Sequence, residues 1–134
     1  MKVVFDTNVL FAALITPGVC AKLLLRARRG DFRLVICPGI RDELAKVLRA
    51  KLKSTPDEVR KDQHLVEEAV AEECQPPGTV RGVCRDPDDD HVLDCLQASG
   101  ADYLVTGDGD LQTLKEFQGA QILSPREFEM LFKD

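Results

Sequence analysis

The sequence predicts a single α/β domain built around a parallel sheet, and two observations carry this prediction. Short apolar runs rich in β-branched or aromatic residues alternate with longer amphipathic runs along the chain. Such alternation is typical of parallel strands joined by helical crossovers that cover both faces of a sheet. The chain has 134 residues, 44% of them hydrophobic, so it is long enough for one compact core.

The predicted strands are short and are separated by turn-forming segments. The candidates are, in chain order, KVVF (2–5), RLVIC (33–37), GTVRGV (78–83), DYLVT (102–106) and AQIL (120–123). Proline, glycine and aspartate predict turns or loops at QPPGT (75–79) and RDPDDD (85–90).

Between the strands, apolar residues recur with the helical period of about 3.6 residues. Four helices are expected, with apolar positions at Leu23, Leu24 and Ala27; at Leu44, Val47 and Leu48; at Val59, Leu65, Val66, Ala69 and Val70; and at Val92, Leu93 and Leu96. The third helix is expected to cover 56–73 and to pack its apolar stripe into the core rather than against a partner. Gly100 follows the fourth, where glycine favours a helix end.

Composition excludes several classes of protein. A net charge of −5 and a pI near 5.1 argue against binding nucleic acid by bulk charge alone. The five cysteines are odd in number and show no C-x-x-C spacing, so neither a disulfide framework nor a zinc knuckle is predicted. No basic leader precedes the first strand, and no apolar run approaches the roughly 20 residues of a membrane span. We therefore expect a soluble, cytoplasmic protein with no membrane association.

The first strand ends in three polar side chains, Asp6, Thr7 and Asn8. Each of these residue types caps helices, but one cap is enough, and we expect Thr7 to serve as it. The carboxyl ends of parallel strands lie at one edge of a sheet, where ligands bind. The two remaining polar groups therefore point to a functional site.

Further acids are expected at the same edge. Glu43 lies early in the helix after RLVIC, Asp90 begins the helix DHVLDCLQAS, and Asp108 follows DYLVT, with Asp110 opening a short helix. Each alone has the alternative reading of a helix cap or a solvated charge. Together, carboxylates about 4 Å apart repel by roughly 4 kcal/mol per pair at an effective dielectric near 20, so they need a cation. Oxygen ligands suit magnesium or manganese, and the two histidines are poorly placed for zinc.

Three segments carry a resemblance to a known family. They are VVFDTNVLFAAL, RDELAKVL around Glu43, and RDPDDDHVLDCLQASGADYLVTGDGDLQTLKEFQGAQILSPREFEMLF. Together they resemble the PIN domain family, in particular the small prokaryotic PIN proteins regarded as toxins of toxin-antitoxin systems. The resemblance spans 1–134 as one PIN domain. It implies a three-layer α/β/α fold with a parallel five-stranded sheet in the order 3-2-1-4-5.

The resemblance also implies a function, that of a metal-dependent endoribonuclease that hydrolyses RNA phosphodiester bonds with one or two Mg²⁺ or Mn²⁺ ions. Its site residues fall here on Asp6, Glu43, Asp90 and Asp108, with Asp110 as an additional acid and Asn8 and Thr106 as supporting polar residues. Asp90 is preferred over Asp86, Asp88 and Asp89 because its separation from VTGD fits the family spacing. The glycines at Gly107 and Gly109 depart from the family pattern, in which a basic or bulkier residue is common.

The resemblance further implies partners: an RNA substrate, a homodimer and a cognate antitoxin that covers the acidic groove. Basic residues in 26–33 and 49–53, with Arg41 and Lys46, are candidates for phosphate contacts, and ordinary solvated charge is the alternative. Phe11 is expected in the core rather than as a stacking platform.

Three other classes compete with this interpretation. A haloacid-dehalogenase-type phosphatase needs a second acid two residues after the first, where this chain has Asn8. A response-regulator receiver needs an acidic pair near the N-terminus and a lysine after a late strand, and this chain shows neither pattern. A catalytically silent PIN-fold module for binding protein or RNA is the third class, and four acids in place argue against it.

Overall fold

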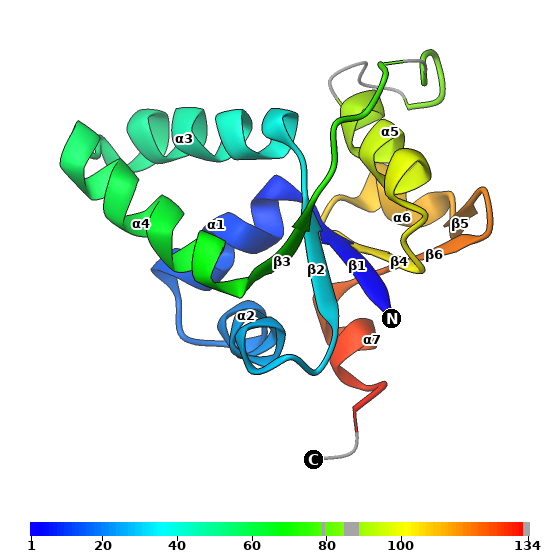
Figure 1. Ribbon diagram of the computed structural model, residues 1–134, viewed down its shortest axis with the longest axis horizontal. Coiled ribbons are helices and arrows are strands. Elements are labelled where there is room, and N and C mark those ends of the chain that lie inside the picture. The colour runs from blue at the N-terminus through cyan, green and yellow to red at the C-terminus, as the bar shows by residue number, and fades with distance from the viewer. Residues whose placement is uncertain (79, 85–88, 133–134) are drawn as a thin grey trace.

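The computed structural model describes residues 1–78, 80–84 and 89–132, and a six-stranded sheet forms the centre of this part of the chain (Figure 1). The elements are, in chain order, β1 (Lys2–Phe5), α1 (Thr7–Ile15), α2 (Val19–Arg29), β2 (Arg33–Ile36), α3 (Pro38–Leu52), α4 (Pro56–Ala69), β3 (Val70–Glu73), α5 (Asp90–Ser99), β4 (Tyr103–Val105), α6 (Gly109–Thr113), β5 (Glu116–Phe117), β6 (Ala120–Leu123) and α7 (Pro125–Glu129).

The sheet has the order β3-β2-β1-β4-β6-β5. The first five of these strands pair in parallel, and the two-residue β5 pairs antiparallel with β6 at the edge. The predicted order 3-2-1-4-5 is thus confirmed for the parallel strands, with one short antiparallel strand added.

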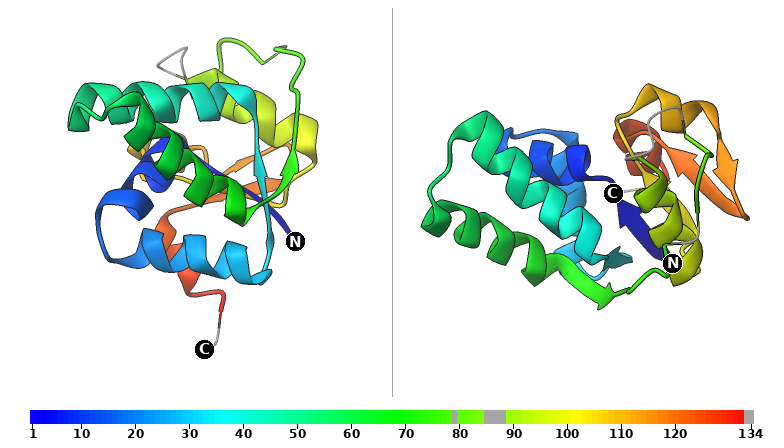
Figure 2. Two further views of the ribbon diagram at one scale, coloured as in Figure 1. Left: turned by 60° about the vertical axis from the view of Figure 1, so that its left-hand side comes forward. Right: turned by 90° about the horizontal axis from the view of Figure 1, so that it is seen from above.

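Helices cover both sides of the sheet. Helices α1 to α4 gather on one side, over the half that contains β3 and β2, and α5 and α6 lie on the other side (Figures 1 and 2). Strand β1 lies between β2 and β4, so Val3 and Val4 are fully buried. The cysteines are free thiols, of which Cys37 and Cys95 are buried in this core.

Most of the predicted elements are present. Strands β1, β2, β4 and β6 match the predicted runs to within one residue at each end, and α2, α3, α4 and α5 carry the predicted apolar stripes. In α4, Val59, Val66 and Ala69 are buried as expected, but Leu65 is 47% exposed.

The third strand was predicted in the wrong place. It is β3 at Val70–Glu73, whereas residues 78 and 80–83 form no strand and residue 79 lies outside the described residues. Alanine and glutamate favour helix in this stretch, so the pattern of α4 runs on in the sequence. Pairing with the open edge of β2 overrides that preference, and α4 ends at Ala69.

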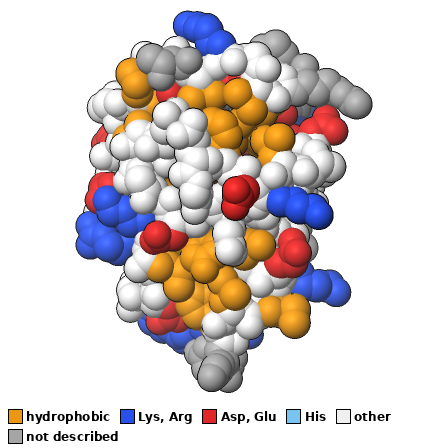
Figure 3. Space-filling view, turned by 90° about the vertical axis from the view of Figure 1, so that its right-hand side faces the viewer, with side chains coloured by type: hydrophobic (Ala, Val, Ile, Leu, Met, Phe, Trp, Pro, Cys, Tyr) orange, Lys and Arg blue, Asp and Glu red, His pale blue; other side chains and the backbone are white. Residues whose placement is uncertain are grey.

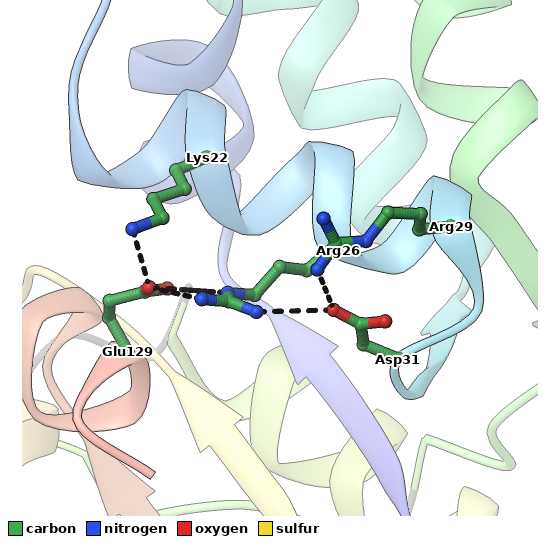
Figure 4. Close-up of polar contacts among 5 residues, drawn as sticks. All are labelled: Lys22, Arg26, Arg29, Asp31 and Glu129. Atoms are coloured by element: carbon green, nitrogen blue, oxygen red, sulfur yellow. Dashed lines mark hydrogen bonds and ion pairs between the residues drawn. The ribbon is translucent and has the colours of Figure 1, made fainter. Parts of the chain in front are cut away.

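The C-terminal helix is fastened to α2 by a buried arginine (Figure 4). The Arg26 side chain is 3% exposed and donates to both carboxylate oxygens of Glu129, with Nε to Oε2 at 2.9 Å and Nη2 to Oε1 at 2.7 Å. Its Nη1 lies 3.2 Å from Asp31 Oδ2, and its guanidinium lies 4.5 Å from the centre of the Phe132 ring. Arg26 is therefore an internal tie, and it is not placed to contact a phosphate.

Gly100 ends α5 in the left-handed conformation, with φ of 67°. An added Cβ would meet no atom within 4 Å, so only backbone strain opposes a side chain there. We expect Gly100→Ala to lower the free energy of unfolding by about 1 kcal/mol, measured by urea denaturation. A loss larger than about 2 kcal/mol would show that more than local strain is involved.

No single helix of the described residues is long and apolar enough to cross a membrane. Helices α1 and α2 reach that length and composition only as a pair, and they are bent by 100° at their junction.

Candidate active site

Asp6 stands at the junction of β1 and α1, at the carboxyl edge of the sheet. Its backbone N–H donates to the Val105 carbonyl at 2.9 Å, so the main chain here is tied to β4. Its side chain is buried and accepts three hydrogen bonds, from Thr7 N at 2.8 Å, Asn8 Nδ2 at 3.1 Å and Thr106 Oγ1 at 2.7 Å. The carboxylate of Asp6 is therefore held in one orientation.

Asn8 and Thr106 link the ends of β1 and β4. Asn8 Oδ1 accepts from Gly107 N at 3.0 Å, and Thr106 Oγ1 accepts from Asp108 N at 3.0 Å. Gln112 Nε2 donates to the Thr106 carbonyl at 2.7 Å, a contact that no sequence pattern indicated. These bonds position Asp108 relative to Asp6.

A cavity of about 190 Å³ opens beside Asp6. Its lining residues are Asp6, Thr7, Asn8, Phe11, Glu43, Val47, Lys51, Asp89 and Asp108. Three of the four acids predicted from the sequence, Asp6, Glu43 and Asp108, thus share one cavity although they come from distant parts of the chain. Asp110 is exposed in the first turn of α6, outside this lining.

The fourth carboxylate on the cavity wall is Asp89, the residue before the predicted Asp90. Asp90 is not part of this lining, and its oxygens accept from Gly82 N and Cys84 N, both at 2.9 Å. These hydrogen bonds hold the pKa of Asp90 below its usual range. Asp90 therefore fastens the loop before α5, while Asp89 lines the cavity. The predicted ligand Asp90 and the cavity-lining Asp89 are thus adjacent in the sequence.

Substitutions at Asp89 and Asp90 are expected to have different effects. Asp89→Asn should weaken Mn²⁺ binding about 10-fold or more, since it removes a charged oxygen from the cavity. Asp90→Asn should lower the thermal midpoint, because it weakens the loop hydrogen bonds, with a smaller effect on Mn²⁺ affinity. Isothermal titration and thermal denaturation of both variants measure the contrast. The reverse pattern would return the ligand role to Asp90.

Helix N-termini offset part of the repulsion among these acids. Asp6 and Asp108 cap α1 and α6 by accepting from Thr7 N and Asp110 N, whereas Asp89 precedes α5 without a side-chain cap hydrogen bond. The unpaired N–H groups and the positive end of a helix dipole stabilise a carboxylate at this position. Burial nevertheless raises the pKa of Asp6, and the nearby Glu43 carboxylate raises it further, while the hydrogen bonds from Thr106 and Thr7 oppose this shift.

Thr7 does not serve as the cap that was predicted for it. The cap is Asp6, whose Oδ1 accepts the Thr7 N–H, while Thr7 Oγ1 is buried with no hydrogen-bond partner among the described residues. The sequence could not separate these roles because both residue types favour the same position.

Glu43 lies on the second turn of α3, across the cavity from α1. Its Oε2 is 3.8 Å from Nε2 of His91, the residue that follows Asp90 on α5. A Cβ added at Gly39 would lie 3.1 Å from His91 Cδ2, so the start of α3 packs closely on this imidazole. The ring thereby fixes the distance between the helices that carry Glu43 and Asp89.

The predicted phosphate contacts fall mostly on paired arginines. Arg41 bonds Glu67 at 2.6 Å and Glu73 at 2.9 Å, and Arg28 lies 3.2 Å from Glu68. On the face shown in Figure 3, acidic and basic side chains are interspersed around hydrophobic areas. Lys51, in the 49–53 segment, is the basic residue on the cavity wall among the described residues.

The donor chemistry of the cavity fits a hard divalent cation. It offers carboxylate and amide oxygens, which suit Mg²⁺ or Mn²⁺. Among the described residues, no three Asp, Glu, His or Cys side chains converge closely enough to hold a metal ion as they stand. The side chain of Glu43 is 37% exposed, so it has the freedom to turn toward an ion beside Asp6.

The fold and the cavity together define an α/β protein with an acid-lined site at the carboxyl end of its central strand. Residues 2–110 match the family model of the PIN domain, and the chain therefore belongs to the PIN domain family. Proteins of this family are generally nucleases.

The chain resembles known proteins in sequence and in fold. It is 34% identical over 119 residues to an uncharacterized protein of Methanocaldococcus jannaschii, covering 87% of this chain and 76% of that protein. Its fold matches a chain in the crystal structure of VapBC2 from Rickettsia felis bound to a DNA fragment from their promoter. The TM-score is 0.67 at 15% identity, covering 91% of this chain and 97% of that one. At this identity the second match shows the fold alone.

Proposed function

We propose that this protein is a Mg²⁺- or Mn²⁺-dependent endoribonuclease. The observation that carries the proposal is the cavity at the end of β1 on which Asp6, Glu43, Asp89 and Asp108 lie together. Four carboxylates around one small space suit a divalent cation better than any uncharged ligand. The membership of the chain in a family of nucleases supports the same reading.

The residues of the cavity divide into proposed metal ligands and residues that position those ligands. Asp6, Asp89 and Asp108 hold the metal, and Glu43 binds it or its water. When bound, the metal lowers the pKa of a coordinated water and polarises the scissile phosphate. Asn8 and Thr106 fix the Asp6 carboxylate through the hydrogen bonds described above, and Thr106 also positions Asp108. Asp110, two residues after Asp108 in the first turn of α6, is an outer acid.

We also propose the partners of a toxin-antitoxin system, with the protein acting in the cytoplasm as a homodimer that an antitoxin holds inactive. Support comes from the neighbour in fold, a chain of VapBC2 from Rickettsia felis bound to a DNA fragment from their promoter. An apolar groove of about 250 Å³ between α1, α2 and α4 offers a surface for such a partner, with Leu25 61% exposed. Its lining residues are Ala13, Leu14, Ala21, Leu24, Leu25, Arg28, Leu65 and Ala69.

The decisive experiment is cleavage of a fluorescent single-stranded RNA by the purified protein. We expect cleavage with Mn²⁺ or Mg²⁺ and none after chelation with EDTA. Cleavage that persists in EDTA would reject the metal-dependent mechanism. RNA binding without cleavage under any metal would favour the alternative function, a catalytically silent PIN-fold binding module. Light scattering of the same preparation tests the homodimer.

A further inference from the structure

The acid-lined cavity has a second end of different chemistry. There Phe11 of α1 and Lys51 of α3 line the wall, and the Lys51 ammonium lies 5.5 Å from the centre of the Phe11 ring. We propose that this pair is a nucleotide subsite, in which Phe11 stacks on an RNA base and Lys51 contacts the adjoining phosphate. The inference rests on the proposed ribonuclease function and names the part of the substrate that is held beside the acids.

The geometry of α3 sets the distance between the two ends. Glu43, Val47 and Lys51 are spaced four residues apart, so they form one stripe along the helix, and all three line the cavity. With a rise of about 1.5 Å per residue, Lys51 lies about 12 Å further along α3 than Glu43. The site is thus elongated, with acids at one end and an aromatic ring with a cation at the other.

Phe11 belongs to the same face of α1 as the first polar residues of the site. It follows Thr7 by four residues, which places both on one side of the helix, and both line the cavity. Phe11 is half-buried, so part of its surface contacts the core and the rest meets the cavity. Lys51 Nζ lies over this ring at 5.5 Å, so a base that stacks on Phe11 would displace the ammonium toward the adjoining phosphate.

Charge favours a nucleic acid at this end. A cavity of carboxylates repels a polyanion, and a metal ion offsets that repulsion only near the acids. Lys51 supplies a positive charge at the far end, where the chain of phosphates would continue. A single lysine facing an aromatic ring gives a contact with little base preference, since every base has a stacking face.

Binding of RNA without turnover tests this subsite directly. The probe is a fluorescein-labelled oligouridine of six nucleotides, with binding followed by anisotropy in the presence of Ca²⁺ in place of Mn²⁺, because Ca²⁺ takes oxygen ligands but activates water poorly. We expect Phe11→Leu to weaken binding about 5- to 100-fold, because it removes a stacking surface. Lys51→Met should weaken binding at low salt and reduce the salt slope by about 0.7, the value for one contact with a single strand.

Matched variants separate the subsite from general charge and from folding. Phe11→Tyr and Lys51→Arg keep the ring and the charge, and should bind like the wild type. Arg49→Met removes one charge from an exposed position on the same helix, outside the cavity, and should bind more tightly than Lys51→Met. Thermal denaturation of each variant checks that the protein is folded.

The outcomes distinguish this inference from the proposed function. Wild-type cleavage of an unmodified RNA, with Phe11→Leu raising KM and sparing kcat, supports both. Cleavage with an unchanged KM and unchanged probe affinity in Phe11→Leu and Lys51→Met overturns the subsite alone. Probe binding that depends on Phe11 and Lys51 without any cleavage keeps the subsite and rejects the nuclease. If Arg49→Met and Lys51→Met weaken binding equally, bulk charge explains the effect and the subsite is rejected.

Discussion

Asp6→Asn is expected to abolish metal-dependent RNA cleavage, with a loss of at least about 100-fold. Removing a residue that only supports a metal ligand typically costs about 10- to 100-fold, and Asp6 is proposed to bind the ion itself. The substitution keeps the shape of the side chain and removes one negative charge from the cavity. Cleavage of fluorescent RNA and Mn²⁺ titration of the same preparation measure the two effects together.

The fold should survive this substitution. Burial and the nearby Glu43 raise the pKa of Asp6, which means that the folded protein disfavours its charged form. A neutral amide removes that cost but places an NH₂ donor where one carboxylate oxygen accepts hydrogen bonds, so the thermal midpoint is expected to change by no more than a few degrees. Inactivity together with a fall of about 10 °C or more would point to misfolding instead.

Two further variants give activity losses with which the loss in Asp6→Asn can be compared. Thr106→Val and Asn8→Ala each remove one hydrogen bond to the Asp6 carboxylate, and each should reduce cleavage about 10- to 100-fold. The loss of cleavage activity in Asp6→Asn should be larger than the loss in either of these variants. If Asp6→Asn cleaves as well as the wild type, then Asp6 binds no catalytic metal and the proposed mechanism is wrong.

The sequence predicted the edge of the sheet at which the site lies, because strand ends are encoded locally. Asp6 and Thr106 directly follow apolar strands, and parallel topology brings such positions together. The positions of Glu43 and Asp108 followed from the helices that come after β2 and β4. The positions of these residues could be predicted because they depend on hydrophobic periodicity and on the order of elements along the chain, and both can be read from a single sequence.

Two features depend on tertiary contacts that the sequence pattern does not contain. Asp89 and Asp90 have the same side chain, and their directions depend on which of them accepts hydrogen bonds from Gly82 and Cys84. Such a choice is made by the tertiary fold, so spacing alone selected Asp90. Likewise β3 exists because β2 has an open edge to pair with, which outweighs the helical preference of its own residues.

Arg26→Met is expected to lower the free energy of unfolding by about 3 kcal/mol, which corresponds to a fall in thermal midpoint of about 10 °C. The substitution keeps much of the apolar stem and leaves Glu129 and Asp31 without their buried cation (Figure 4). Lys22 Nζ still lies 3.1 Å from Glu129 Oε1, which limits the cost to the lower part of the range for broken buried pairs. Thermal and urea denaturation at neutral pH measure the change.

Arg29→Met is the matched control for this substitution. Arg29 also bonds Asp31, at 2.6 Å, but its side chain is 59% exposed, so its loss should cost less than about 1 kcal/mol. Equal effects at the two positions would contradict the role given to burial.

The same pair predicts how stability depends on pH. Hydrogen bonds from Arg26, and then from Lys22, lower the pKa of Glu129 in the folded protein. A carboxylate with a lowered pKa contributes stability above its ordinary value of 4.5, and this contribution is lost as the pH falls through the folded pKa. Arg26→Met removes the main cause of the shift. The wild type should therefore lose more stability than Arg26→Met below about pH 4.5, and the two unfolding curves should approach each other in acid. Parallel pH profiles would mean that Arg26 stabilises the C-terminal helix by packing on Phe132, with no contribution from its charge.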